Sequence, residues 1–352
     1  MAVAVLAGAV CITYLVKDHV RTLWSLRRVP GTNAYVIDYY ADYNLDEIRA
    51  HGMDVKNVED GLINVFFPDV IASVGMCVKG WYLDQSVATI PPNVDRCSTI
   101  VSRLPGGHVY FGRNFDWMHD ACLIVRMHDE SGLASIAVID LHYLNLDRLD
   151  LDETNLIQRI PLLFAPYYLQ DGMNRHGVAV SDMSVDGVKA SFDPAKPDIL
   201  HATAMRLVLD DAKYIDEAID IFQRYNIHFG ATTCHFMVAD ATGKSAVIEF
   251  VDGKVTVTDS KLNWQVCTNH QICGTSEEAS DKKCERYRHA SDELTRLGTT
   301  AGIQDVMRIM QSVSKKDWTM WSSAYDLSSR RFRFAYRGHF DKPYDDSLVD
   351  SK

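Results

Sequence analysis

The sequence has no excess of basic residues. Its 352 residues include 36 Lys and Arg against 47 Asp and Glu, which gives a formal net charge of −11. Binding of nucleic acid without regard to sequence requires a basic face that displaces counterions. We therefore expect no nucleic-acid partner. Repeats and low-complexity tracts are also lacking, and the share of hydrophobic residues (47%) is that of an ordinary globular protein.

The eight cysteines lack the spacing of a structural zinc site. No Cys-x-x-Cys pair is matched by a second such pair or by His-x-x-x-His. A grouping of Cys234 and His235 with the segment 267–273 fails on the same ground. The sequence therefore predicts neither a metal nor a cofactor, and most cysteines are expected to be small buried residues in a reducing compartment.

No hydrophobic run reaches the length of a membrane span. Residues 1–16 are apolar apart from Thr13, but a span needs roughly 20 such residues. No basic residue precedes the run, as one would in a secretory signal. Lys17 and Arg21 follow it, which favours a cytoplasmic location for the rest of the chain. We expect a cytoplasmic or membrane-tethered protein whose membrane contact is confined to residues 1–16.

Short β-rich runs dominate the chain after a break at Pro91-Pro92-Asn93, which lies just before Cys97. Residues 240–244 are expected to form a hairpin loop between two of these runs. The expected strands are 98–102, 108–111, 122–127, 135–141, 177–185, 235–239, 245–251, 254–258, 321–327 and 332–336.

Two segments have helical spacing of apolar residues, 201–225 and 285–297. The expected strands come in adjacent pairs rather than alternating with helices. This order favours a layered α+β architecture over a doubly wound parallel sheet.

We expect a cation and a carboxylate to lie beside Cys97. It begins a strand, and the returning strand ends in Gly112-Arg113-Asn114-Phe115-Asp116. A hairpin of this length brings Arg113 and Asp116 back beside Cys97. A neighbouring cation and carboxylate can stabilise a thiolate and orient an amine. The alternative is a merely buried cysteine beside a structural Arg113–Asp116 ion pair.

From Cys97 to Tyr336 the sequence resembles the choloylglycine hydrolase family, also called linear amide C–N hydrolases. This family includes conjugated bile acid hydrolases and penicillin V acylase, with acid ceramidase and N-acylethanolamine acid amidase as more distant relatives. The resemblance implies a four-layer αββα sandwich of antiparallel sheets, the fold of N-terminal nucleophile hydrolases. It is carried, in order, by Cys97, the segment 112–116, the segment 171–178, the segment 245–250, Thr268-Asn269, Glu285-Arg286-Tyr287 and the segment 318–327.

The resemblance also implies a role for individual residues. Cys97 corresponds to the nucleophile, and Arg113 to the residue that positions the thiolate and the substrate. Asp116 corresponds to the carboxylate that holds the free α-amine. Asn269 is similar to the side-chain donor of the oxyanion hole, and Arg286 to the second active-site arginine.

Other positions are less specific. Ser184 stands where relatives place a second oxyanion donor or another substrate contact. Trp117 and Tyr143 could line an acyl pocket, together with Met118, Leu141 and Leu144, although a core role is an equal alternative for each of them.

An N-terminal extension of 96 residues precedes Cys97. By resemblance to the ceramidase-like relatives, we expect autocatalytic cleavage between Arg96 and Cys97. This cleavage divides the chain into a prosegment (1–96) and an amidase domain (97–352). The prosegment of those relatives stays associated after cleavage, and whether residues 1–96 do so is left open by the sequence. A freed α-amine has a pKa of about 7.7–8.0 and can act as the base for its own thiol.

The substrate expected by resemblance is a small N-acyl amide with a bulky apolar acyl group. Bile acid conjugates, penicillin V, N-acyl homoserine lactones and fatty acyl amides of the N-acylethanolamine or ceramide type stay open. A papain-like reading with His235 or His270, and a silent binding protein with this fold, are the competing hypotheses. Assembly into a homo-oligomer is left open.

Overall fold

The computed structural model describes residues 17–53, 55, 97–104, 107–188, 192–229, 232–297 and 302–349. The apolar run 1–16, the break at residues 91–93 and Arg96 lie outside this part of the chain, so the expectations placed on them stay predictions. Within the described part, no helix combines the length and the apolar character that a membrane span needs.

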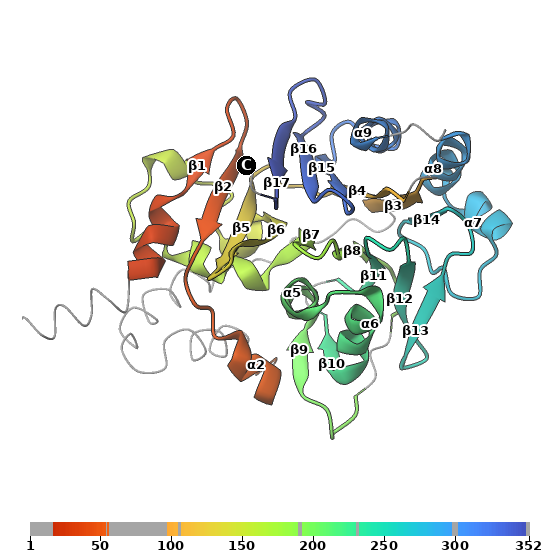
Figure 1. Cartoon of the computed structure of the whole chain (residues 1–352), viewed down its shortest axis with the longest axis horizontal. Coiled ribbons are helices and arrows are strands. Elements are labelled where there is room, and N and C mark those ends of the chain that lie inside the picture. Colours follow the sequence, from red (N-terminus) through yellow and green to blue (C-terminus); the bar gives the residue numbers. More distant parts are fainter. Residues whose placement is uncertain are drawn as a thin grey trace, which may run out of the picture.

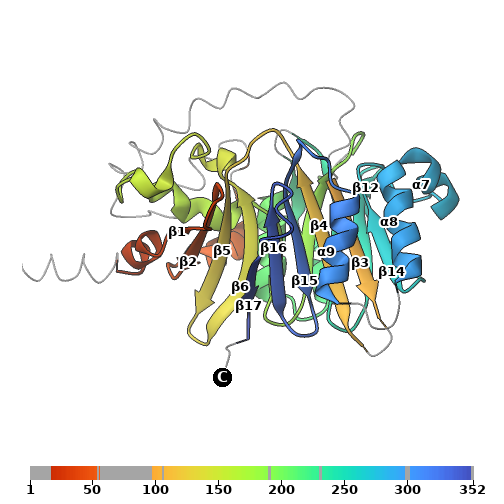
Figure 2. The same ribbon diagram turned by 90° about the horizontal axis from the view of Figure 1, so that it is seen from above.

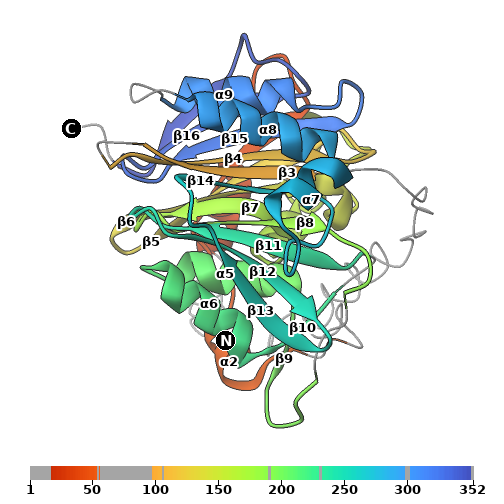
Figure 3. The ribbon, with the colours of Figure 1, turned by 90° about the vertical axis from the view of Figure 1, so that its right-hand side faces the viewer.

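Four layers build the molecule, as Figure 3 shows: two β-sheets pack face to face, and helices cover each outer side. Helices α8 (Glu285–Arg296) and α9 (Ile303–Ser312) cover one sheet, and α5 (His201–Asp211) and α6 (Ile215–Arg224) cover the other. The prediction of an αββα sandwich is confirmed.

The six-stranded sheet has the order β14-β3-β4-β15-β16-β17 and is antiparallel throughout. Figure 2 shows β3 and β4 side by side beneath α9. Each strand expected in this region exists, with bounds that differ by a few residues. The strands are β3 (Cys97–Arg103), β4 (Val109–Asp116), β14 (Trp264–Cys267), β15 (Thr319–Asp326), β16 (Arg331–Tyr336) and β17 (Tyr344–Ser347).

The nine-stranded sheet has the order β1-β2-β5-β6-β7-β8-β11-β12-β13. Residues 240–244 connect β11 to β12, as predicted for a hairpin loop. The strands are β1 (Arg27–Arg28), β2 (Ala34–Tyr39), β5 (Cys122–Asp129), β6 (Gly132–Asp140), β7 (Leu169–Asn174), β8 (Ala179–Ser184), β11 (Cys234–Ala239), β12 (Ser245–Val251) and β13 (Lys254–Asp259).

Two strands of this sheet, β1 and β2, precede Cys97 in the sequence. All six residues of β2 are buried, and β2 pairs in parallel with β5 over its whole length. Figure 1 shows β2 between β1, which forms the edge of the sheet, and β5. The sequence did not indicate this strand, because a strand buried on both faces lacks the alternation of apolar and polar residues.

The single helix expected over 201–225 is wrong: α5 and α6 are separate. Ala212 is extended (φ −82°, ψ 131°), and α6 begins where the buried Asp240 accepts the main-chain N–H of Ile215 at 3.0 Å. A carboxylate from the β11–β12 loop thus caps the first turn of α6. The spacing of apolar residues within 201–225 could not reveal a partner so far along the chain. Helix α9 was not anticipated either.

The remaining described elements are short connections. They are α2 (Leu45–His51), η1 (Leu141–Leu144), η2 (Leu151–Glu153), η3 (Ile160–Tyr167), β9 (Asp198–Leu200), β10 (Asn226–His228) and α7 (Glu277–Lys283).

One apolar cluster fills the space between the sheets and beneath α8 and α9, and it includes Cys97. Phe115 stacks on Trp321 within it, with ring centroids 4.2 Å apart. A second cluster lies between the nine-stranded sheet and α5 and α6. The first residue of β3 therefore lies inside the molecule, between the two sheets.

Candidate active site

The β3–β4 hairpin places Cys97 beside the end of β4. Cys97 is opposite Phe115 in the antiparallel register, and Thr99 is opposite Arg113. Arg113 and Asp116 therefore return to the level of Cys97, as the sequence predicted. Cys97 is buried, with 4% of its surface exposed.

Two side chains bind the main chain of Cys97 from outside the hairpin. Its N–H donates to Asn269 Oδ1 at 2.7 Å, and its carbonyl accepts from Arg286 Nη1 at 2.5 Å. Arg286 Nη2 also donates to Asn269 Oδ1 at 3.0 Å. The loop after β14 and the start of α8 thus meet at Cys97. The resemblance implied that Asn269 and Arg286 belong to its site, but not that they bind its main chain.

The amide group of Asn269 is directed toward Ser184. Asn269 Nδ2 donates to the Ser184 carbonyl at 2.7 Å and lies 3.3 Å from Ser184 Oγ. The structure therefore brings both expected oxyanion-site residues together, and in this state the amide donates to Ser184.

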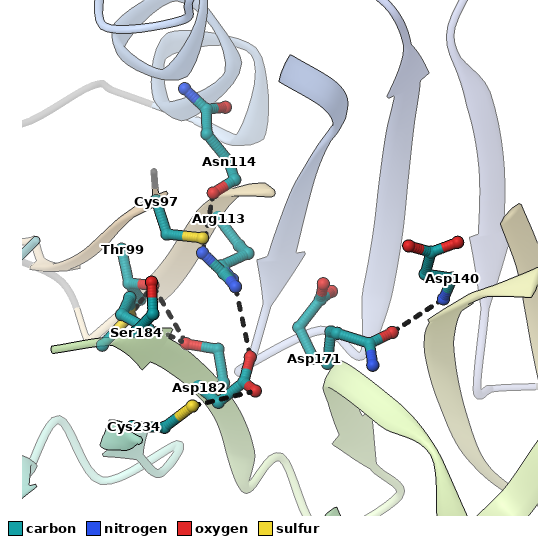
Figure 4. A network of polar contacts seen from close by, with 12 residues as sticks. Cys97, Thr99, Arg113, Asn114, Asp140, Asp171, Asp182, Ser184 and Cys234 are labelled. Carbon is teal, nitrogen blue, oxygen red and sulfur yellow. Dashed lines mark hydrogen bonds and ion pairs between the residues drawn. The ribbon is translucent and has the colours of Figure 1, made fainter. Parts of the chain in front are cut away.

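The guanidinium group of Arg113 is completely buried between the thiol and a carboxylate. Arg113 Nη2 is 3.3 Å from Asp182 Oδ1, Nη1 donates to the Asn114 carbonyl at 2.7 Å, and the Cys97 thiol is a further hydrogen-bond partner. Figure 4 shows Arg113 between Cys97 and Asp182. Burial raises the pKa of the Cys97 thiol, and Arg113 acts in the opposite direction.

Asp116 does not pair with Arg113, so the alternative of an Arg113–Asp116 ion pair is wrong. Its Oδ1 accepts from Thr319 Oγ1 at 2.5 Å, and its Oδ2 lies 3.6 Å from Arg286 Nη1 without a hydrogen bond from any described residue. Burial raises the pKa of Asp116 to about 6, against the opposing charge of Arg286.

Asp182 was missed by the sequence analysis, although it lies in the strand that carries Ser184. Its carboxylate also lies 3.8 Å from Cys234 Sγ and 3.9 Å from His201 Nε2. An acidic residue in an otherwise buried strand could have indicated that Asp182 has a charged partner, since a buried carboxylate needs a cation or several donors.

Another buried pair, His235 and Glu249, contacts Thr268, the residue before Asn269. His235 Nδ1 is 3.0 Å from Glu249 Oε1, and His235 Nε2 is 2.6 Å from the Thr268 carbonyl. Glu249 also accepts the main-chain N–H groups of Ile272 and Cys273. His235 thus holds the residue before Asn269, and among the described residues no hydrogen bond joins it to Cys97, which disfavours a papain-like pair with His235. His270 Nδ1 lies 3.0 Å from Thr268 Oγ1.

The two expected lining residues lie at the ends of strands. Trp117 follows β4, and its N–H donates to the Trp318 carbonyl at 2.8 Å. Tyr143 lies in η1, half-buried, and stacks on Tyr168 with centroids 6.2 Å apart. A cavity of about 480 Å³ opens elsewhere, beside β16 and β17, and Cys97 does not line it.

Comparison with known proteins adds sequence and fold relationships to this geometry. Residues 165–339, just under half of the chain, match the family described as acyl-coenzyme A:6-aminopenicillanic acid acyl-transferase. Penicillin V acylase of Pectobacterium atrosepticum is 31% identical over 111 residues, which are 28% of this chain and 29% of that relative. The chain thus aligns with less than a third of this curated relative.

Solved structures share the architecture. A variant of the conjugated bile acid hydrolase of Clostridium perfringens has a TM-score of 0.51 and 14% identity, over 71% of this chain and 92% of that one. A second variant of the same hydrolase gives a TM-score of 0.51 over 72% and 92% of the two chains. Penicillin V acylase from Agrobacterium tumefaciens has a TM-score of 0.49 and 19% identity, over 68% and 83%.

The family match includes Ser184, Asn269 and Arg286 and begins after Cys97. This match therefore gives no information about Cys97, Arg113 and Asp116, whose arrangement is known from the geometry of the hairpin alone. The chain is thus similar in sequence to this acyl-transferase family over residues 165–339 and shares its αββα fold with a conjugated bile acid hydrolase.

Proposed function

We propose that the chain hydrolyses the linear amide bond of an N-acyl compound, with Cys97 as an N-terminal nucleophile. The observation that carries the proposal is the set of contacts on one residue. Asn269 binds the Cys97 nitrogen, Arg286 binds its carbonyl and Arg113 lies at its thiol. A cysteine buried for packing alone needs none of these contacts.

The first step we propose is cleavage of the chain before Cys97. The thiol attacks the carbonyl carbon of Arg96, the C–N bond breaks, and the Cys97 nitrogen takes up a proton. Water then hydrolyses the thioester, which releases the Arg96 carboxylate and regenerates the thiol. In the uncut chain the Cys97 nitrogen is an amide and cannot act as a base, so this form is expected to be inactive toward substrates.

The freed α-amine would have acceptors already in place. Asn269 Oδ1 is 2.7 Å from the Cys97 nitrogen, and the buried Asp116 Oδ2 has no hydrogen bond from the described residues. Near neutral pH part of this amine is unprotonated, because its pKa is about 7.7–8.0. It can therefore accept the thiol proton and later give it to the leaving amine.

The proposed reaction then proceeds in two balanced stages. The thiolate attacks the amide carbonyl, the amine leaves with the proton from the α-ammonium, and a thioester remains. Water attacks the thioester, which gives the free acid and restores Cys97. The oxyanion formed in each attack needs a preorganised donor, typically worth about 2.7–4 kcal/mol, and Asn269 Nδ2 is the side chain we assign to it.

A substrate panel with a matched cysteine control tests the proposal. The panel contains penicillin V, glycine-conjugated bile acid, an N-acyl homoserine lactone, an N-acylethanolamine and a ceramide, and amine release is measured. Wild-type protein should have a terminus at position 97 and hydrolyse at least one class. Cys97→Ala should remain one chain without activity, whereas Cys273→Ala should behave as wild type.

Two results would contradict the proposal. One is an intact mass that shows a single uncut chain in active protein. The other is amine release that survives Cys97→Ala. Hydrolysis confined to the N-acylethanolamine or the ceramide would favour the fatty acid amidase alternative. Correct cleavage with no hydrolysis across the panel would favour a binding protein.

A further inference from the structure

A group of histidines and carboxylates lies outside the proposed active site, where the β4–β5 connection meets η1. The donor atoms of His119, His142 and Asp147 all lie within 4.8 Å of one another. The two imidazole rings are stacked, with centroids 3.6 Å apart and planes inclined by 17°. None of these residues is used in the proposed hydrolysis.

We propose that His119, His142 and Asp147 bind a divalent transition-metal ion of the zinc class. Two imidazoles and one carboxylate are a ligand set that such ions accept, with further coordination positions left to water. The ligands come from two segments of the chain, and their spacing in the sequence follows no known motif, which explains why the sequence predicted no metal.

The distance between His142 and Asp147 fits such an ion. His142 Nδ1 lies 3.3 Å from Asp147 Oδ2 but makes no hydrogen bond with it. Two donor atoms bound tetrahedrally at 2.0–2.1 Å from one zinc ion are about 3.3 Å apart.

A fourth residue, Asp140, would orient one of the ligands. His119 Nδ1 is 3.3 Å from Asp140 Oδ2. When Nδ1 donates to this carboxylate, Nε2 of His119 presents its lone pair to the ion. A carboxylate that fixes the tautomer of a ligating histidine is the usual support in metal sites.

The main chain holds the ligands in place before an ion binds. The Leu141 N–H donates to the Ala121 carbonyl at 3.0 Å and joins the two segments. Asp140 Oδ1 accepts the His142 N–H at 2.8 Å. The Leu146 N–H donates to the Leu141 carbonyl at 3.0 Å, and this turn returns Asp147 to His142.

Another group of donors, Asp182, His201 and Cys234, is also compact. The cationic Arg113 already lies 3.3 Å from Asp182, so a divalent ion there would meet a like charge. The two groups differ in chemistry, because only the second offers a thiolate. This difference makes them distinguishable in one experiment.

Cobalt binding to the full-length protein tests the site. Metal-free protein, prepared with a chelator, is titrated with Co²⁺ by calorimetry and visible absorption, and Zn²⁺ is then added as a competitor. We expect one Co²⁺ per chain, a spectrum without a thiolate charge-transfer band, and displacement by Zn²⁺. Zn²⁺ should also raise the thermal midpoint of unfolding, because it binds the folded chain.

Variants assign the ligands. His142→Asn and Asp147→Asn should each weaken Co²⁺ binding at least tenfold, and Asp140→Asn should weaken it by about 10- to 100-fold. His289→Asn, at an exposed position of α8, should bind as wild type. Thermal unfolding without metal confirms that each variant is folded.

Three outcomes would overturn the site: no binding of one ion per chain, affinity unchanged in His142→Asn, or a thiolate band that places the ion at Cys234. None of these measurements depends on amide hydrolysis. Failure of the metal site and failure of the proposed activity are therefore separate results.

Discussion

Residues of both charges are buried around Cys97, and their charged groups are removed from water. Arg113 is buried between Cys97 and Asp182, with the carboxylate of Asp171 also close enough to affect its pKa. Asp171 is itself held by Trp321 Nε1 and Ser323 Oγ, each at 2.9 Å. Removing one partner of such a buried pair is expected to cost about 3–5 kcal/mol, because a charge is left uncompensated.

Asp116 should make the uncut chain less stable near neutral pH. Its folded pKa of about 6 lies above its ordinary value of 3.8. The folded state therefore binds more protons between these two values, so the free energy of unfolding falls as pH rises from about 4 to 6. The full shift corresponds to about 3 kcal/mol.

Urea unfolding of the Cys97→Ala chain, with and without Asp116→Asn, measures this effect. The unfolding free energy is compared at about pH 4.5, inside the range where the folded state binds more protons, and at about pH 7, above it. Asp116→Asn should raise stability at pH 7 and flatten the pH dependence. Equal pH dependence in the two proteins would show that Asp116 titrates normally.

At the scale of elements, the loop after β14 depends on a neighbouring sheet. His235 in β11 and Glu249 in β12 hold Thr268, and Asn269 follows directly. A carbonyl accepts only, so Nε2 of His235 carries a hydrogen. The nine-stranded sheet thus fixes the position of Asn269, which binds the Cys97 nitrogen of the six-stranded sheet.

His235→Gln should lower kcat more than it changes KM. The glutamine can still donate to Thr268 but loses the ion pair with Glu249, so Asn269 is expected to shift. A displacement of about 1 Å can cost about 10²-fold in rate. Steady-state kinetics on the substrate identified by the panel would measure it, with the exposed His108→Gln as control. A change in KM alone would contradict the positioning role.

Helix α9 packs directly over a glycine of β4. A Cβ at Gly112 would lie 2.8 Å from both Met310 Sδ and Val306 Cγ1. Gly112→Ala should therefore lower the free energy of unfolding by about 1–3 kcal/mol, the usual cost of overpacking. At Gly302, the N-cap of α9, the nearest atom is 4.0 Å away, so Gly302→Ala gives the cost of alanine at this helix end without overpacking. Thermal unfolding compares them, and an equal effect of both changes would show that α9 is not held so closely.

At the scale of the whole molecule, the segment before Cys97 is part of the fold. β2 is a buried member of the nine-stranded sheet, and Tyr39 donates to the Leu163 carbonyl at 2.7 Å. Arg28 adds ion pairs with Asp150 and Asp152. Cleavage at residue 97 would therefore leave these contacts intact.

The two chains formed by cleavage should stay together. We expect them to co-elute in gel filtration under native conditions and to separate in denaturant. Ile37→Asp places a charge where β2 is fully buried and should release or destabilise the segment, whereas Glu47→Gln, at an exposed position of α2, should not. Separation of the wild-type chains without denaturant would contradict this prediction.

The sequence by itself determined the layered architecture and the return of Arg113 and Asp116 to the level of Cys97. Strand periodicity, the hairpin from Cys97 to Asp116 and an ordered set of motifs were enough, because each is local or fixed by chain order. It could not determine the partners of Arg113 and His235, the strand β2, the break between α5 and α6, or the group of His119, His142 and Asp147. Those features join segments that are distant in the chain, and only the packing of the two sheets and the buried charges between them decides which side chains meet.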